Sequence, residues 1–77
     1  MNEWQRVERM AKVYKEMYPV GTRIELIHME DSQAVPSSTK GTVVCVDDMG
    51  TIHMKWDNGR TLGLIPEADS FRKIEEE

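Results

Sequence analysis

The sequence predicts a mainly β fold, in which one N-terminal α-helix precedes a small barrel of five short strands. Apolar residues recur at helical spacing as far as Tyr18, and Pro19 ends this helix because proline lacks a backbone N–H and disfavours the α conformation of its predecessor. From Thr22 onward apolar and polar residues alternate, which is the period of a half-buried strand. Turn residues, above all Asn58-Gly59, separate these alternating segments at short intervals.

A chain of 77 residues supports one domain, because at this size only about 60% of the unfolded surface is buried. Within that domain we assign residues 1–18 to an N-terminal amphipathic helix and residues 19–77 to the barrel. Asn2 and Gln5 form a capping pair at the helix start. We expect the apolar stripe of the helix to pack across one open end or face of the barrel, and the alternative is docking on another protein or on a second copy. The stripe consists of Trp4, Val7, Met10, Ala11, Tyr14, Met17 and Tyr18.

Five strands are predicted after the helix, over residues 22–29, 41–47, 51–56, 60–65 and 71–74. Residues 30–40 contain Pro36 and several small polar residues, so we expect a long loop there. Asn58-Gly59 predicts a type I′ turn between the third and fourth strands, because both central positions of that turn need positive φ. Trp56 and Phe71 are expected in the core. Short strands, a long first loop and tight later turns are typical of an SH3-like barrel.

Composition predicts a small soluble protein of the cytoplasm. No stretch approaches the ~20 apolar residues of a membrane-spanning helix, and the N-terminus lacks the apolar core of a signal peptide. The formal net charge is -4, which disfavours non-specific attraction to phosphate backbones. Cys45 has no second cysteine with which to form an internal disulfide, so a reducing compartment is the natural setting.

The sequence shows no constellation of catalytic residues, and we expect neither an enzyme nor a cofactor or metal site. Cys45 lies in a valine-rich segment, where cysteine usually behaves as a small buried hydrophobe. His28 and His53 lie on different predicted strands with opposite orientations, and their spacing matches no metal-binding motif. The acidic pairs Glu30-Asp31 and Asp47-Asp48 lack the alternating spacing of a calcium loop, so we interpret them as solvated turn residues.

The stretch from Tyr18 to Ile74 resembles a family of short bacterial domains of unknown function that are often encoded on mobile elements. The segments that carry the resemblance are YPVGTRIEL, KGTVV, VDDMG, WDNG and LGLIPEADSFRKI. More distantly, the order of Gly21, the KGTV segment and the WDNG segment resembles the sequence pattern of SH3-like barrels of the KOW and Tudor type. That resemblance implies the fold, and members of this wide class bind RNA, DNA, ribosomal protein or peptide.

We expect a non-enzymatic interaction module that binds a protein partner, as an accessory factor of a bacterial mobile element. The candidate partner-binding residues are Trp4, Tyr14, His28, His53, Lys55 and Arg60, with the loop 33–39 beside them. The chain is expected to be a monomer or a homodimer formed through the N-terminal helix.

The alternative is a nucleic-acid-binding KOW-like module. It requires six cations to converge on one side of the domain: Arg23, Lys40, Lys55, Arg60, Arg72 and Lys73. A third possibility is a subunit that completes an enzyme elsewhere.

Overall fold

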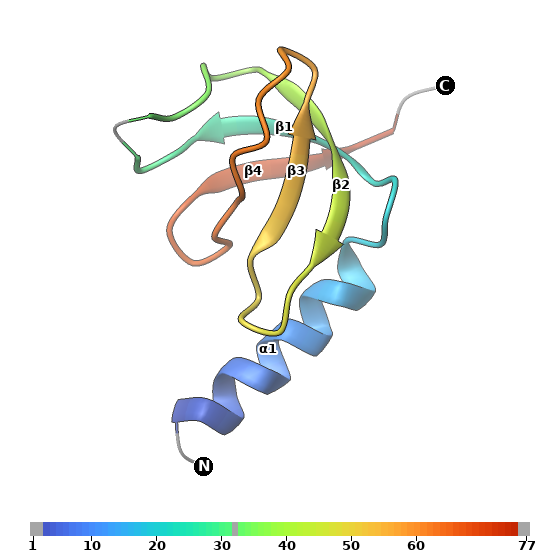
Figure 1. The fold of residues 1–77 in the computed structure, drawn as a ribbon, viewed down its shortest axis with the longest axis vertical. Helices are drawn as coiled ribbons and strands as arrows, with labels where there is room; N and C mark the ends of the chain where they lie inside the picture. Colours follow the sequence, from blue (N-terminus) through green and yellow to red (C-terminus); the bar gives the residue numbers. More distant parts are fainter. Residues whose placement is uncertain (1–2, 32, 76–77) are drawn as a thin grey trace.

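The structure, a computed structural model, describes residues 3–31 and 33–75 (Figure 1). Within those residues, helix α1 (Glu3–Met17) is followed by four strands: β1 (Arg23–His28), β2 (Lys40–Val46), β3 (Ile52–Trp56) and β4 (Ser70–Ile74). The strands form one antiparallel sheet in the order β3-β2-β1-β4. The prediction of a mainly β fold with an N-terminal helix is confirmed. The predicted capping residue Asn2 lies outside the described residues.

The segment predicted as the fourth of five strands, residues 60–65, is not a strand in the structure. It makes one isolated bridge, in which Ile52 and Leu64 exchange backbone hydrogen bonds of 2.9 and 2.8 Å. The physical reason is Trp56, whose indole Nε1 donates to the Leu62 carbonyl at 2.7 Å. This side-chain bond occupies a carbonyl that a regular ladder would use. In the part of the chain that the structure describes, the sheet therefore has four strands and does not close.

The turn after β3 also differs from its prediction. Gly59 has a φ of +91°, whereas Ser38 is the non-glycine residue with positive φ in the described part of the chain, so Asn58 has negative φ. The Gly59 N–H donates to the Trp56 carbonyl at 2.9 Å, and the Trp56 N–H donates to the Arg60 carbonyl at 2.8 Å. Such a three-residue loop combines a type I turn with a left-handed glycine. The type I′ prediction is therefore wrong, although the chain does reverse here.

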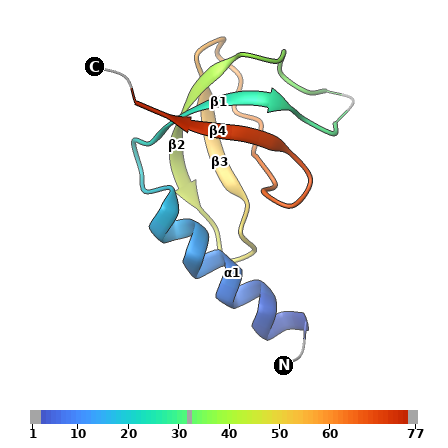
Figure 2. The same cartoon turned by 180° about the vertical axis from the view of Figure 1, so that it is seen from behind.

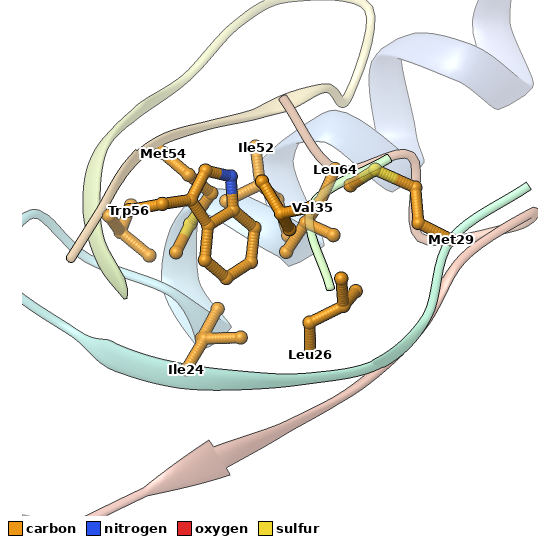
Figure 3. Close-up of a cluster of buried hydrophobic side chains, with 9 residues drawn as sticks. Ile24, Leu26, Met29, Val35, Ile52, Met54, Trp56 and Leu64 are labelled. Atoms are coloured by element: carbon orange, nitrogen blue, oxygen red, sulfur yellow. The ribbon is translucent and has the colours of Figure 1, made fainter. Parts of the chain in front are cut away.

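The core lies inside the curled sheet, where labelled side chains from β1 and β3 point toward one another (Figure 3). Trp56 is 1% exposed, as its inward position in the alternation predicts. Gly41 lies opposite it on β2, and a Cβ at Gly41 would be 2.7 Å from Trp56 Cε3. Phe71 is half-buried against the cluster, with its ring edge-on to that of Tyr18 at a centroid distance of 5.6 Å. The buried members are Ile24, Leu26, Met29, Val35, Val43, Ile52, Met54, Trp56 and Leu64.

A bulge in β2 interrupts the alternation of inward and outward side chains. The pairing of β2 with β3 shifts register between Val43 and Cys45, and Val44 and Cys45 are both exposed. The prediction that Cys45 is a buried small hydrophobe is therefore wrong. The extra residue of the bulge is the reason, because it turns two successive side chains outward.

Helix α1 packs against the end of the sheet beside the turn between β2 and β3, and its N-terminal part projects beyond the sheet (Figure 2). Ala11 is its buried residue, and a Cβ at Gly50 in the turn would lie 3.3 Å from Tyr14 Cδ2. Lys15 Nζ pairs with Asp48 Oδ1 at 2.7 Å. The middle of the apolar stripe, around Ala11 and Tyr14, thus covers one end of the chain's own sheet, whereas Trp4 and Met17 are exposed. Across residues 3–31 and 33–75, no helix is long and apolar enough to span a membrane.

Candidate functional site

A groove of about 120 Å³ lies beside α1, and most of the residues that line it are apolar. Three segments that lie far apart in the sequence form it. They are the helix residues Val7, Met10 and Tyr14, the turn residues Met49, Gly50 and Thr51, and the later residues Ile65, Pro66 and Glu67. We call this surface the α1 groove.

The turn between β2 and β3 holds one wall of the α1 groove in place. Asp47 Oδ1 accepts hydrogen bonds from the backbone N–H groups of Met49, at 2.9 Å, and Thr51, at 3.0 Å. Gly50 has a φ of +86°, which glycine adopts without a steric penalty, and its missing side chain leaves room for the ring of Tyr14. The tight turn therefore directs the side chain of Met49 into solvent, where it is 64% exposed.

Asp69 fixes the segment 65–67, which forms another wall of the α1 groove. Its Oδ2 accepts a hydrogen bond from the Ile65 N–H at 2.8 Å, and its own N–H donates back to the Ile65 carbonyl at 2.9 Å. Asp69 Oδ1 accepts from the Glu30 N–H at 3.1 Å, which ties this wall to the start of the first loop. Ile65 and Pro66 are thereby held next to the helix, although neither belongs to a strand.

The α1 groove is suited to binding apolar side chains. Met49 and Ile65, 64% and 53% exposed, both line the groove, and Glu67 is the one charged residue in its lining. Apolar side chains exposed together beside a hollow are typical of surfaces that bind other proteins, whereas singly exposed apolar residues carry no such meaning.

A second groove of about 320 Å³ lies on another flank of α1 and has a different character. Trp4, 57% exposed, forms one side of it. The remaining lining is mostly charged, and the Lys15–Asp48 ion pair stands at its edge. The lining residues are Trp4, Glu8, Ala11, Lys12, Lys15 and Asp48. Because four of its six lining residues are charged, this groove offers less apolar contact than the α1 groove. Two of these charges, on Lys15 and Asp48, already pair with each other.

The structure separates the six candidate residues predicted from the sequence. Tyr14 lines the α1 groove, and Trp4 lines the second groove beside the same helix. His28, at the end of β1, lies 3.8 Å from Glu30 Oε1. Arg60 donates to the Ala34 carbonyl at 3.3 Å, on a different part of the molecule.

His53 and Lys55 complete the six, and both are exposed on the outer face of β3. The structure therefore brings Trp4 and Tyr14 to one helix and leaves the other four candidates away from it. Sequence reasoning missed Met49, Ile65 and Pro66. For Met49 a signal was present, because an apolar residue occupies the turn VDDMG, where polar residues are usual. Ile65 and Pro66 gave no such signal, because they lie at the end of a predicted strand.

The outer face of the sheet carries cations that are largely matched by carboxylates. Arg23 makes a bidentate pair with Asp57, at 2.8 and 2.6 Å, and the hydrogen bonds from Arg23 hold the pKa of Asp57 below its ordinary value. Arg72 Nε donates to Glu25 Oε1 at 2.6 Å. Lys55 lies opposite Thr42 in the same cross-strand row as Arg23. Charges of both signs therefore alternate across this face.

Asp47 also contacts His53, whose Nε2 lies 2.8 Å from Asp47 Oδ2. Burial raises the pKa of Asp47, but the hydrogen bonds from His53, Thr51 and Met49 outweigh it and hold that pKa below its ordinary value. Cys45 faces His53 across the strand pair. Within residues 3–31 and 33–75, no group of three or more His, Cys, Asp or Glu side chains is placed to hold a metal ion.

A family model for a domain of unknown function, DUF4314, matches residues 7–74. The match covers most of the chain, and the protein belongs to this family. It includes all four strands and most of α1, which the resemblance inferred from the sequence had left outside. No curated protein and no solved structure matches the chain.

Proposed function

We propose that this chain is a non-enzymatic interaction module that binds a protein partner, and that the α1 groove receives an apolar segment of that partner. The observation that carries the proposal is that two exposed apolar side chains, Met49 and Ile65, line one hollow from different segments of the chain. Each is held by a turn whose backbone is fixed by an aspartate. A preformed groove of this kind lowers the entropy lost on binding.

The partner segment is expected to be apolar with basic flanks. The lining of the α1 groove contains one charge, the carboxylate of Glu67, and the whole chain has a formal net charge of -4. Complementary charge steers association and selects among partners of similar apolar content. Met10 and Met49 supply flexible contacts that adapt to more than one apolar side chain.

Selection from a random peptide library displayed on phage tests this proposal. Peptides enriched on the wild-type protein should combine apolar residues with Lys or Arg. They should bind Ile65→Lys more weakly by about tenfold or more, because the new cation repels them and removes an apolar wall. In methyl NMR spectra, they should shift the signals of Met10 and Met49 while leaving that of Met54, which is 1% exposed, unchanged.

Val20→Lys is the matched control, because Val20 is 75% exposed, lies outside both grooves and acquires the same charge. Peptides should bind this variant as they bind the wild type. Enrichment of peptides without apolar residues, or equal binding to the Ile65 and Val20 variants, would contradict the proposal.

We also propose that the chain folds as an SH3-like barrel and that it acts in the bacterial cytoplasm. An SH3-like barrel is supported by the bridge between Ile52 and Leu64, and by the pairing of β1 with both β2 and β4. The landmark segments between Tyr18 and Ile74 support a bacterial accessory factor of a mobile element that acts in the cytoplasm.

A nucleic-acid-binding module is the second candidate, because four of the six cations that it requires lie on the outer face of the sheet. They are Arg23, Lys40, Lys55 and Arg72. The carboxylates of Asp57 and Glu25 on the same face weaken this candidate. Affinity for single-stranded RNA measured at two salt concentrations decides it: phosphate contacts weaken steeply with salt, and they should weaken further in Lys55→Glu.

A further inference from the structure

The methionines in the described part of the chain differ widely in their access to solvent. Met49 is 64% exposed and Met17 is 47% exposed, whereas Met10 is half-buried. Met29 and Met54 belong to the buried cluster, where Figure 3 shows them among the other core side chains. Met49 is therefore, among the described methionines, the one most open to a soluble reagent.

The two exposed methionines also differ in their positions. Met49 lines the α1 groove, whereas Met17, at the end of α1, lines neither of the two grooves. Met10 lines the α1 groove as well, but most of its surface is covered. A chemical change at Met49 consequently alters the α1 groove, and the same change at Met17 does not.

The turn that carries Met49 is anchored on both sides of this residue. Asp47 Oδ1 accepts a hydrogen bond from the Met49 N–H at 2.9 Å, and the next residue, Asp48, forms an ion pair with α1 at 2.7 Å. Gly50 lies so close to the ring of Tyr14 that a Cβ would be 3.3 Å from Tyr14 Cδ2. These contacts hold the backbone of Met49 at the groove whatever the chemical state of its side chain.

The side chain of methionine is a thioether, which peroxides oxidise to a sulfoxide. A lone pair of the sulfur attacks one oxygen of hydrogen peroxide, an S–O bond forms as the O–O bond breaks, and the other oxygen leaves as water. The sulfur loses two electrons to the peroxide. A methionine sulfoxide reductase reverses the change, because a dithiol supplies two electrons, becomes a disulfide and releases the oxygen as water.

We infer that Met49 is a site of reversible oxidation by peroxides, and that its sulfoxide closes the α1 groove to apolar segments. The inference rests on the proposed function, since it concerns the same groove. Oxidation converts a flexible apolar side chain into a polar one. An apolar partner segment that packs on the sulfoxide removes water from its oxygen, in a groove whose lining is mostly apolar. Burial of a polar group without a new hydrogen bond is unfavourable, so the partner binds more weakly.

The free chain tolerates this change. Because the side chain of Met49 is mostly in solvent, its sulfoxide oxygen is hydrated and no polar group enters the core. Met29 and Met54 are covered by the rest of the buried cluster, so they meet peroxide only when the structure opens. Oxidation therefore acts on the groove before it acts on the fold.

Exposure of the full chain to hydrogen peroxide for increasing times tests the inference. Cys45 is exposed and reacts with the same reagent, so all measurements use the Cys45→Ser background. Mass spectrometry of the digested chain should detect sulfoxide at Met49 at least about tenfold faster than at Met29 and Met54, because the buried pair reacts only through opening. Circular dichroism should show that the chain oxidised at Met49 keeps its fold.

The binding probe is one peptide without sulfur, taken from those enriched on the wild-type protein by phage display. After the peroxide has been removed, the Kd of this peptide for the oxidised chain should be raised by about tenfold, the effect of burying one poorly paired polar group. Treatment with a methionine sulfoxide reductase and dithiothreitol should restore the original Kd. Met49→Gln places a polar amide at the same position, so it should bind the peptide as weakly as the oxidised chain does, without peroxide.

Two matched variants separate the groove from exposure in general. Met49→Leu keeps an apolar side chain in the groove but has no sulfur, so it should bind the peptide equally before and after peroxide. Met17→Leu removes the other exposed thioether, and peroxide should weaken its binding as it does in the parent chain.

The failure of this inference is distinguishable from the failure of the proposed function. Equal peptide affinity of the reduced and the oxidised chain would overturn the inference alone, because the peptide still binds. A loss of affinity in oxidised Met49→Leu as large as in the parent chain would also overturn it, by assigning the effect to another residue. If phage display enriches no peptide, the proposed function fails, and the inference fails with it.

Discussion

At the scale of single residues, one absent carbon atom decides how β2 and β3 pack around Trp56. A Cβ at Gly41 would lie 2.7 Å from Trp56 Cε3 and 3.1 Å from the Lys55 carbonyl oxygen. The second of these neighbours is backbone and has little room to move. Gly41→Ala is therefore expected to lower the free energy of unfolding by ~1–3 kcal/mol, the usual cost of overpacking a filled core. Urea denaturation followed by far-ultraviolet circular dichroism measures it.

A double-mutant cycle isolates the contact that causes this loss. In the background of Trp56→Phe the second ring of the indole is absent, so Gly41→Ala should cost less there than in the wild type. Equal costs in the two backgrounds would contradict overpacking against the indole. Gly21 provides a comparison, because an alanine there meets no atom within 4 Å and its cost would come from the φ of +92° alone.

The burial of individual residues was predictable where a strand is regular, and not where it is bulged. Trp56 falls at an inward position of an uninterrupted alternation, and it is buried as predicted. Cys45 also lies in an apolar run, but a bulge beside it turns Val44 and Cys45 outward together. A bulge depends on how the partner strand is paired, which a single strand's sequence does not contain. For the same reason, the exposure of Cys45 beside His53 could not be predicted from the sequence.

At the scale of elements, the turn between β2 and β3 depends on the ionised carboxylate of Asp47. Its folded-state pKa is lowered, so it contributes stability that is present above the unfolded pKa of ~3.9 and is lost as the pH falls through the folded value. Asp47→Asn should lower the free energy of unfolding by ~1 kcal/mol at pH 7, a modest value because this side chain is partly exposed. The measurement is urea denaturation at a series of pH values.

The difference between Asp47→Asn and the wild type should shrink as the pH falls below ~4, because the protonated aspartic acid then resembles the amide. A difference that stays constant with pH would show that the charge of Asp47 has no part in holding the turn. Asp48→Asn is the matched control. Asp48 is the next residue, its side chain is 90% exposed, and its contact is a surface pair with Lys15.

Elements were predictable from the sequence where local chemistry determines them. Pro19 ends the helix and apolar alternation marks the strands, because both effects act within a few residues. The segment 60–65 shows the limit, since the Leu62 carbonyl is used by the Trp56 indole rather than by a strand. The α1 groove shows it again: Met49 and Ile65 belong to different turns, and only packing of the helix brings them to one surface.

At the scale of the whole molecule, the sheet contributes more than the helix to the free energy of unfolding. The buried cluster draws its members from residues 24–64 and includes no residue of α1, whose buried contact with the rest of the domain is made by Ala11. Deleting residues 1–16 should therefore leave a folded sheet that retains Tyr18 against Phe71. The deletion is expected to lower the free energy of unfolding by ~1–3 kcal/mol, the scale of one buried apolar side chain.

Urea denaturation followed by Trp56 fluorescence measures this loss, because the deletion removes the other tryptophan and leaves a buried reporter, 1% exposed in the intact chain. The matched variant is Trp4→Ala in the full chain, which should change stability little because Trp4 is 57% exposed and lies in the first turn of α1. A deleted chain without a cooperative transition would contradict this division, since it would make the helix part of the folding unit. If the transition persists, loss of peptide binding by the deleted chain can be attributed to the missing wall of the α1 groove rather than to unfolding.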